Sequence, residues 1–329
     1  MALKPTTNGL VALKPPTDED ERMDEVLTWV LEGDPAVRWP ALRDLRGASE
    51  RVVARERRLV AEQGWGARLL GAQNPDGGWG TGVYSPKWTS TTYTLLRLVW
   101  LGLPVGHPST GRGCERLWEW ASRWRVPETC VASILVRVTC AHGHAADGLD
   151  GMVTYLLDEQ LDDGGWNCAT HTNKAKHSSF HTSIQALEAL AAYGGPVDVG
   201  PAVRRGREFF LNHKLYQSHR TGEVAIPGST RLRAFPEWHF DVLRGLEYFA
   251  QSGAERDERL HDAIEVVVRQ RRPDGRWPVH AAYPGKQWFE AEPPGPSRWN
   301  TSRVLRVLQW WDAAPNSTRS RTGTKPRSR

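Results

Sequence analysis

The chain has 329 residues, of which 39% are hydrophobic and 25% are charged, and its formal net charge is +5. These values are typical of a soluble globular protein that is large enough to bury a sizeable core. No stretch approaches 18 consecutive apolar residues, which argues against a membrane-spanning helix. The four cysteines form no Cys-x-x-Cys pair and follow no signal peptide, which argues against a disulfide framework. We therefore expect a cytoplasmic protein.

The two ends of the chain differ from its middle. Residues 1–20 contain three prolines and no continuous apolar run, so we expect a flexible leader. Residues 313–329 are predicted to be a disordered basic tail, because Ser317–Arg329 contains five Lys or Arg residues and no acid. Such a tail permits peripheral contact with an anionic membrane. Since no nucleic-acid-binding motif accompanies it, we expect no nucleic acid partner. Residues 21–312 are predicted to form a single domain.

Helical patterns alternate along this domain. Six stretches combine a charged side with an apolar side: 21–32, 51–71, 110–122, 148–160, 201–213 and 257–271. Six further helices are predicted to begin near Asp34, Pro86, Pro127, Ser178, Pro236 and Pro296, where proline or a capping Ser, Thr or Asp marks the first turn. The alternation predicts six helical hairpins and no strand of useful length.

One motif occurs three times, in Gln73–Trp79, Gln160–Trp166 and Gln270–Trp277. Each copy ends an apolar helical stretch with a glutamine, continues through Asp-Gly or Asp-Gly-Gly-type turns, and finishes in a tryptophan. Glycine accepts the positive φ that terminates a helix, so the tryptophan can fold back over the helix end while the glutamine bonds a neighbouring backbone. Three copies in the same context indicate a repeat architecture.

These repeats and hairpins resemble the isoprenoid (terpenoid) cyclase and protein prenyltransferase β-subunit superfamily, including the squalene cyclases. The resemblance covers roughly residues 21–312 and implies an all-α fold, an (α/α)6 toroid of six helical hairpins with a central cavity. The 16 tryptophans suit such a fold, which has a cavity wall as well as a core to line.

The resemblance also implies a zinc site of the prenyltransferase type. Prenyltransferases hold zinc with an Asp-x-Cys at one inner helix start and a histidine at the next. The matching residues here are Glu128, Cys130 and His181, with glutamate in place of aspartate. Carboxylate, thiolate and imidazole are all zinc ligands, and an open fourth position would admit substrate or water. Zinc is therefore the expected cofactor, although Cys130 as a buried small residue and His181 as a helix cap are the structural alternatives.

Other reactive residues gather at the same helix starts. Acid–base or nucleophilic candidates are His239, Asp241, His177 and Cys168. A diphosphate would suit the basic side chains of Lys87 and Arg298, and an apolar substrate or carbocation would suit the aromatic side chains of Trp88, Tyr93, Trp238 and Trp299. Each residue taken singly has a structural alternative, as a surface charge or a packing residue.

The expected function is that of a prenyltransferase-like or terpenoid-cyclase-like enzyme acting on an isoprenoid or other apolar substrate, with zinc-assisted transfer to a small nucleophile. The sequence lacks the Asp-x-Asp-Asp acid of protonating cyclases, which argues against that mechanism. Two alternatives remain open. One is a noncatalytic toroid that binds a lipid or a protein partner, and the other is a carbocation cyclase without the usual acid.

Overall fold

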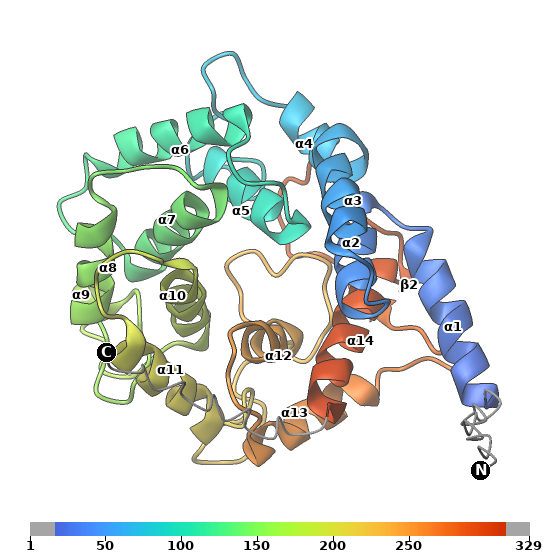
Figure 1. Ribbon diagram of the computed structural model, residues 1–329. Helices are drawn as coiled ribbons and strands as arrows, with labels where there is room; N and C mark the ends of the chain where they lie inside the picture. Colours follow the sequence, from blue (N-terminus) through green and yellow to red (C-terminus); the bar gives the residue numbers. More distant parts are fainter. Residues whose placement is uncertain (1–16, 314–329) are drawn as a thin grey trace, which may run out of the picture.

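A computed structural model describes residues 17–313, and this part of the chain is mostly helical (Figure 1). Helix α1 begins at Asp18, inside the predicted leader. Residues 1–16 of the predicted leader, and all of the predicted basic tail except residue 313, lie outside the described residues. No helix between residues 17 and 313 is long and apolar enough to cross a membrane.

The helices alternate between an outer and an inner set. The outer set comprises α1 (Asp18–Leu31), α3 (Glu50–Glu62) with α4 (Gly64–Gly71), α6 (Pro108–Ala121), α8 (Leu149–Asp158), α11 (Gly200–Asn212) and α13 (His261–Val268), which follows the 3-10 turn η1 (Glu258–Leu260). The inner set comprises α2 (Pro35–Asp44), α5 (Thr91–Leu101), α7 (Thr129–His142), α10 (Phe180–Ala192), α12 (Val242–Gln251) and α14 (Arg298–Asp312). The short elements are α9 (Thr170–Asn173), β1 (Pro278–Val279) and β2 (Gly295–Pro296), and the two strands pair antiparallel.

The sequence predicted one helix over 51–71, but the structure breaks it in two. Gly64 adopts a φ of +64°, which ends the α-helical path between α3 and α4. Helices α5 and α12 begin several residues after Pro86 and Pro236, because the intervening segments form turns before the first helical residue.

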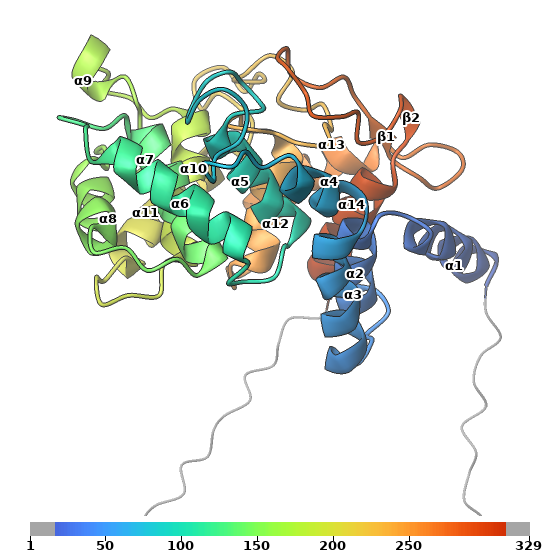
Figure 2. The same ribbon diagram turned by 90° about the horizontal axis from the view of Figure 1, so that it is seen from above.

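The helices follow one another around a circuit in the order of the sequence (Figure 1). The last helix, α14, returns to pack against α1 and α2. Arg298 at its start donates to the Trp29 carbonyl oxygen of α1 at 2.8 Å, and Arg306 pairs with Asp44 at the end of α2 at 2.6 Å. Figure 2 shows α9, β1, β2 and the loops near them on one side of the molecule.

The three repeated motifs build equivalent corners. The indole Nε1 of Trp79, Trp166 and Trp277 donates to a carbonyl oxygen ten residues earlier, in the last turn of the preceding helix, at 2.6, 2.6 and 2.9 Å. The glutamine amide that opens each motif donates to backbone carbonyl oxygens. The backbone N–H of each tryptophan donates to a side-chain hydroxyl of the next inner helix, on Thr91, Ser183 or Thr301. The folding back that the sequence predicted is thus present at all three corners.

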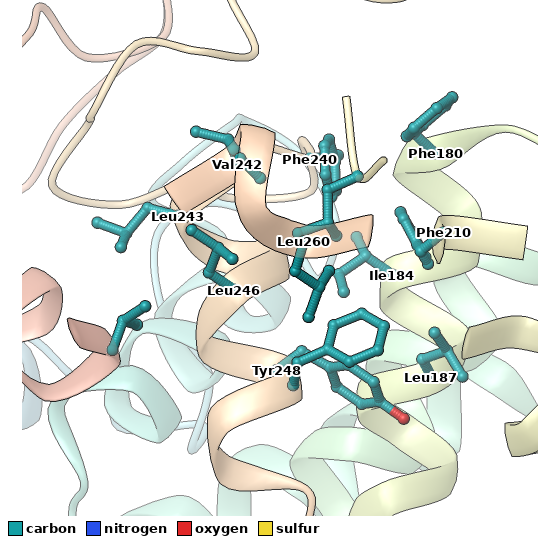
Figure 3. Packing of buried hydrophobic residues seen from close by; sticks show 14 of the residues in the cluster. Phe180, Ile184, Leu187, Phe210, Phe240, Val242, Leu243, Leu246, Tyr248 and Leu260 are labelled. Atoms are coloured by element: carbon teal, nitrogen blue, oxygen red, sulfur yellow. The ribbon is translucent and has the colours of Figure 1, made fainter. Parts of the chain in front are cut away.

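Aromatic side chains fill the space between inner and outer helices. Phe180 of α10, Phe210 of α11 and Phe240 before α12 meet with ring centroids 5.3 to 5.7 Å apart (Figure 3). Leu187 and Leu246 belong to the same buried cluster. Burying each such side chain stabilises the fold by roughly 1.5–3 kcal/mol, so this packing holds the inner helices, and the polar groups that they carry, in place.

Candidate functional site

Five of the predicted site residues form one aromatic and imidazole cluster at the starts of α5, α10 and α12. The His239 ring stacks between Trp238 and Tyr283, at centroid distances of 3.8 and 3.4 Å. Trp88 lies 5.7 Å from His239. The cluster comprises Trp88, Tyr93, His181, Trp238 and His239, and Lys87 Nζ lies 5.2 Å from the Trp238 ring centroid.

Both histidines of this cluster are neutral near pH 7. Burial, followed by the charge of Arg244, lowers the pKa of His181 to about 4. Burial, followed by the neighbouring His181, lowers the pKa of His239 to about 3. His181 Nδ1 accepts the Phe240 backbone N–H at 2.8 Å, so its proton is on Nε2. His239 Nδ1 lies 3.3 Å from the Pro236 carbonyl oxygen and donates to it, which leaves Nε2 as a free acceptor.

The predicted zinc ligands do not fit a zinc site as they are placed. A zinc-bound histidine coordinates through one ring nitrogen and donates from the other, whereas His181 accepts a hydrogen bond at Nδ1 and carries its proton on Nε2. Glu128 is exposed, with its carboxylate 4.0 Å from Cys130 Sγ. Among residues 17–313, no three His, Cys, Asp or Glu side chains form a group that could hold a metal ion. We therefore derive no chemical step through zinc.

Cys130 instead has a second cysteine as its neighbour. The interaction of the two thiols lowers the pKa of Cys168 and raises that of Cys130, whose Sγ lies 4.0 Å from the Glu128 carboxylate. Cys168 is half-buried, and the Thr182 hydroxyl also lowers its pKa. The Cys168 thiol is therefore shifted toward its thiolate form.

The remaining predicted residues lie elsewhere. Asp241 does not pair with His239, because its Oδ1 caps α12 by accepting the Arg244 backbone N–H at 2.8 Å. His177 is exposed in the loop before α10. Arg298 ties α14 to α1 through the Trp29 carbonyl oxygen and Glu32. Trp299 packs edge-on against Trp65 at 5.8 Å, away from the aromatic and imidazole cluster.

The structure reveals a charged belt that the sequence did not predict. Arg137 of α7 pairs with Glu188 of α10, and Glu188 also accepts from Arg244 of α12 at 3.0 Å. Arg303 of α14 donates to Glu247 of α12 at 3.0 Å. Burial lowers the pKa of Arg137 to about 10. A signal was present in the sequence, because Arg137 and Glu188 are single charges in otherwise apolar helices, as in Ile134-Leu-Val-Arg-Val138.

Glu237 links the belt to the aromatic and imidazole cluster. It is 1% exposed and accepts from Arg97 Nε of α5 at 3.0 Å, while Gln287 accepts from the same guanidinium. Its φ of +56° is unusual for a residue with a side chain, and such strain of about 1–3 kcal/mol is found mostly at functional sites. Burial raises the pKa of Glu237 to about 7 despite the charge of Arg97. Its Oε2 has no hydrogen-bond partner among the described residues.

A cavity of about 400 Å³ lies beyond the belt, toward the ends of α5, α10 and α12. Gly102, Ala192 and Ser252 at these helix ends contribute to its wall. Its large apolar side chains are Trp39, Trp100 and Trp299, and its charged side chains are Arg43, Arg57, Arg137, Glu188, Arg244, Glu247, Arg303 and Arg306. All predicted site residues lie within the described part of the chain, and among them only Trp299 lines this cavity.

The loop between β1 and β2 closes the opposite side, where the sequence predicted the substrate site. Its Lys286 N–H donates to the Lys87 carbonyl oxygen at 2.9 Å, and its Trp288 Nε1 donates to Thr94 Oγ1 at 3.0 Å. Trp88 Nε1 donates to the Pro284 carbonyl oxygen at 3.0 Å. These contacts bury Trp88 to 2% exposure, while His181, Trp238 and His239 remain partly exposed, so the loop covers the Trp88 end of the cluster.

Comparisons with known proteins give only distant similarities. No protein family and no curated protein matches the sequence. Among solved structures, a protein from Actinoplanes covers 89% of this chain and 98% of its own, at 16% identity and a TM-score of 0.42. The type II terpene cyclase MstE from Scytonema covers 78% of this chain and 96% of its own, at 13% identity and a TM-score of 0.30. These matches concern a helical fold at low similarity.

Proposed function

We propose that this protein is an enzyme of the prenyltransferase and terpenoid-cyclase type, folded as an (α/α)6 toroid, that takes an isoprenoid or similar apolar substrate into its cavity. The observation that carries the proposal is the cavity wall of Trp39, Trp100 and Trp299. A volume of about 400 Å³ lies in the range of small-molecule sites, roughly 300–1,000 Å³, and such sites are lined mainly by apolar and aromatic side chains.

The charges around the cavity favour group transfer over protonation-driven cyclisation. A protonating cyclase moves a proton from a neutral acid to the alkene and leaves the conjugate base of that acid as the counter-anion, whereas ionisation of a prenyl diphosphate breaks its C–O bond and leaves a diphosphate anion that arginines can bind. Each unpaired arginine at roughly 8 Å would raise the energy of the carbocation by about 2 kcal/mol at an effective dielectric constant of 20. Together with the missing Asp-x-Asp-Asp sequence, this repulsion makes cyclisation of an uncharged alkene the weaker alternative.

A noncatalytic toroid that binds a lipid is the second candidate. The β1–β2 loop supports it, because this loop packs over Lys87 and Trp88 at the helix starts, where the sequence placed the reactive side chains. The two candidates make the same prediction for binding and opposite predictions for turnover.

Binding is tested with farnesol, followed by quenching of tryptophan fluorescence. We expect saturable binding that is weakened in Trp100→Ala and retained in Trp124→Ala, a tryptophan outside the cavity wall. Equal affinity in both variants, or no binding at all, would refute the proposal. Turnover is then tested with prenyl diphosphates of 10, 15 and 20 carbons and a small thiol, by detecting released pyrophosphate and alkylated thiol. Binding without product would identify the noncatalytic alternative.

A further inference from the structure

Two histidines meet just beyond the end of α11, and neither belongs to the aromatic and imidazole cluster. The Nδ1 atom of His213 lies 2.7 Å from the Phe209 carbonyl oxygen, and because a carbonyl oxygen only accepts hydrogen bonds, this nitrogen carries the proton. The Nε2 atom of the neutral His213 ring therefore presents its lone pair to His219, whose Nδ1 lies 2.9 Å away. The pair consists of one acceptor and one donor in direct contact.

The surroundings of His213 keep its ring neutral. The ring packs against Phe180 and Phe209, at centroid distances of 5.2 and 4.5 Å. Burial is the largest cause that lowers the pKa of His213, and the neighbouring His219 lowers it further, against the opposing effects of the Phe209 carbonyl and Asp163. The lone pair on Nε2 is therefore available near pH 7.

The backbone between the two histidines is well defined. Lys214 and Leu215 adopt φ values of +42° and +68°, a conformation that costs about 1–3 kcal/mol for a residue with a side chain. The Leu215 side chain is fully buried and anchors this turn. Residues 217–224 then form a hairpin closed by an antiparallel bridge between its two ends. His219 lies on this hairpin, so a hydrogen-bonded backbone brings its ring back to the end of α11.

The geometry of the pair is close to that of two histidines on one metal ion. A histidine ligand coordinates through one ring nitrogen and donates from the other, often to a backbone carbonyl oxygen, and His213 already donates in this way. Two nitrogens bound to a tetrahedral ion at about 2.0–2.1 Å lie roughly 3.3 Å apart, so the 2.9 Å contact has to open by about 0.4 Å. His219 has to move its proton from Nδ1 to Nε2, a change of tautomer that leaves the ring neutral.

The charges around the pair are compatible with a bound cation. The ammonium group of Lys214 pairs with Asp262 at 2.8 Å. Asp163 acts on His213 through its charge, but its carboxylate accepts the Ser178 backbone N–H at 2.9 Å and is engaged there. Since no three His, Cys, Asp or Glu side chains of the described chain form a metal-binding group, water would fill the remaining positions of an ion held by these two histidines.

We propose that His213 and His219 bind one divalent transition-metal ion of the zinc class, and that this ion ties the 217–224 hairpin to the end of α11. The site uses none of the residues that the resemblance to prenyltransferases implied as zinc ligands, and it does not depend on the proposed function. Neutral imidazole nitrogens favour zinc, nickel and copper over magnesium and calcium, which prefer oxygen ligands.

Binding is measured by titration calorimetry of the full chain, after treatment with a chelator, using Zn²⁺ and, as the oxygen-preferring comparison, Mg²⁺. We expect one Zn²⁺ per chain that is lost in His219→Ala, and no binding of Mg²⁺. His219 is exposed, so its substitution leaves the core intact. His144→Ala, which removes a partly exposed histidine in the turn after α7, is the matched control and is expected to bind unchanged. Cys130→Ala is also expected to retain this ion, because no thiol takes part.

Limited proteolysis provides a second measurement, because Arg220 is exposed on the hairpin. If cleavage requires the hairpin to leave α11, Zn²⁺ at about 100 times its Kd should slow tryptic cleavage after Arg220 by up to about 100-fold in the unmodified protein and not in His219→Ala. Cleavage after Arg123, an exposed site beyond the end of α6, corrects for any effect of Zn²⁺ on trypsin. Zn²⁺ binding that persists in His219→Ala, that is lost equally in His144→Ala or Cys130→Ala, or that is absent from the unmodified protein would overturn the proposal.

Discussion

The outer wall and the interior of this molecule are built in different ways. In the wall, all three corners repeat the bond from a tryptophan indole to the last turn of its helix. At two of them the glutamine also donates to the next outer helix, whereas Gln270 donates to the Thr230 carbonyl oxygen. In the interior, each of several inner helices contributes a different charged side chain, and the partners come from different helices. Repetition in the wall is what a scaffold requires, whereas the unrepeated charges in the interior cost desolvation energy and point to function.

The interior is expected to be the more sensitive of the two regions. Glu188→Gln removes the carboxylate that two buried arginines share, and we expect it to destabilise the protein by about 3–5 kcal/mol. Glu208→Gln, which removes an exposed partner of Arg259, is the control and is expected to cost less than about 1 kcal/mol. Urea unfolding measures both. Similar costs for the two variants would show that the belt is not a buried unit.

Glu237 gives the interior a pH dependence that the wall lacks. Its pKa is about 7 in the fold and ordinarily 4.5 when the chain is unfolded, so the folded protein binds more protons between these values. Stability contributed by this group is therefore present below pH 4.5 and is lost as the pH rises toward 7. Between pH 5 and pH 8 we expect the stability of the unmodified protein to fall by about 2 kcal/mol relative to Glu237→Gln.

The comparison for this prediction is the exposed carboxyl of Glu62. Glu62→Gln is expected to follow the unmodified protein across the same pH range in urea unfolding. A difference between the unmodified protein and Glu237→Gln that is constant with pH would show that Glu237 is ionised throughout.

The corners of the wall depend on close packing around each tryptophan. A Cβ at Gly113 of α6 would lie 2.6 Å from Trp79 Cζ3, so Gly113→Ala forces the indole to move and is expected to cost about 1–3 kcal/mol. Gly111 lies in the same helix with no heavy atom within 4 Å of its added Cβ. Gly111→Ala is expected to be neutral or to stabilise by up to about 1 kcal/mol through its helix propensity. Thermal melting of the Gly113→Ala and Gly111→Ala variants tests this packing, and equal melting temperatures would contradict the close contact between α6 and Trp79.

The smallest effect is expected at the paired thiols. Cys168 should react with iodoacetamide below the usual pH range of a thiol, because its interaction with the Cys130 thiol lowers its pKa. Buried Cys114, whose pKa is raised to about 12, should remain unreacted. Cys130→Ala should shift the alkylation profile of Cys168 to higher pH, as followed by mass spectrometry. An unchanged profile would mean that the two thiols do not interact.

Much of the helical order was predictable from local patterns. The structure of the Gln–Gly–Trp segments and of the amphipathic outer stretches depends on residues close together in the chain. Four of the predicted outer stretches therefore agree with α1, α6, α8 and α11 to within a few residues at each end. The break at Gly64 was not predicted, because glycine is tolerated inside a helical pattern and its φ depends on surroundings. One such contact is with Asp34, which accepts the Trp65 backbone N–H from 31 residues away.

The candidate site was predicted only in part. The aromatic and imidazole cluster follows from the shared position of its members at the inner helix starts. The hydrogen bond that occupies His181 comes from the Phe240 backbone, 59 residues away, so no local pattern encodes it. The bond from the Arg244 backbone N–H to Asp241 is a local N-cap, and the capping preference of aspartate could have predicted it.

The sequence by itself therefore determined the alternation of helices and the three tryptophan corners, because caps, turns and periodicity act between residues close in the chain. Only the tertiary structure decided which end of the inner helices is open, through the β1–β2 loop that packs over Lys87 and Trp88 about 200 residues away. It also decided that single charges in apolar helices meet as a belt beside an arginine-lined cavity. The physical reason is that a buried charge is defined by its partners, and these partners come from helices that only the folded chain brings together.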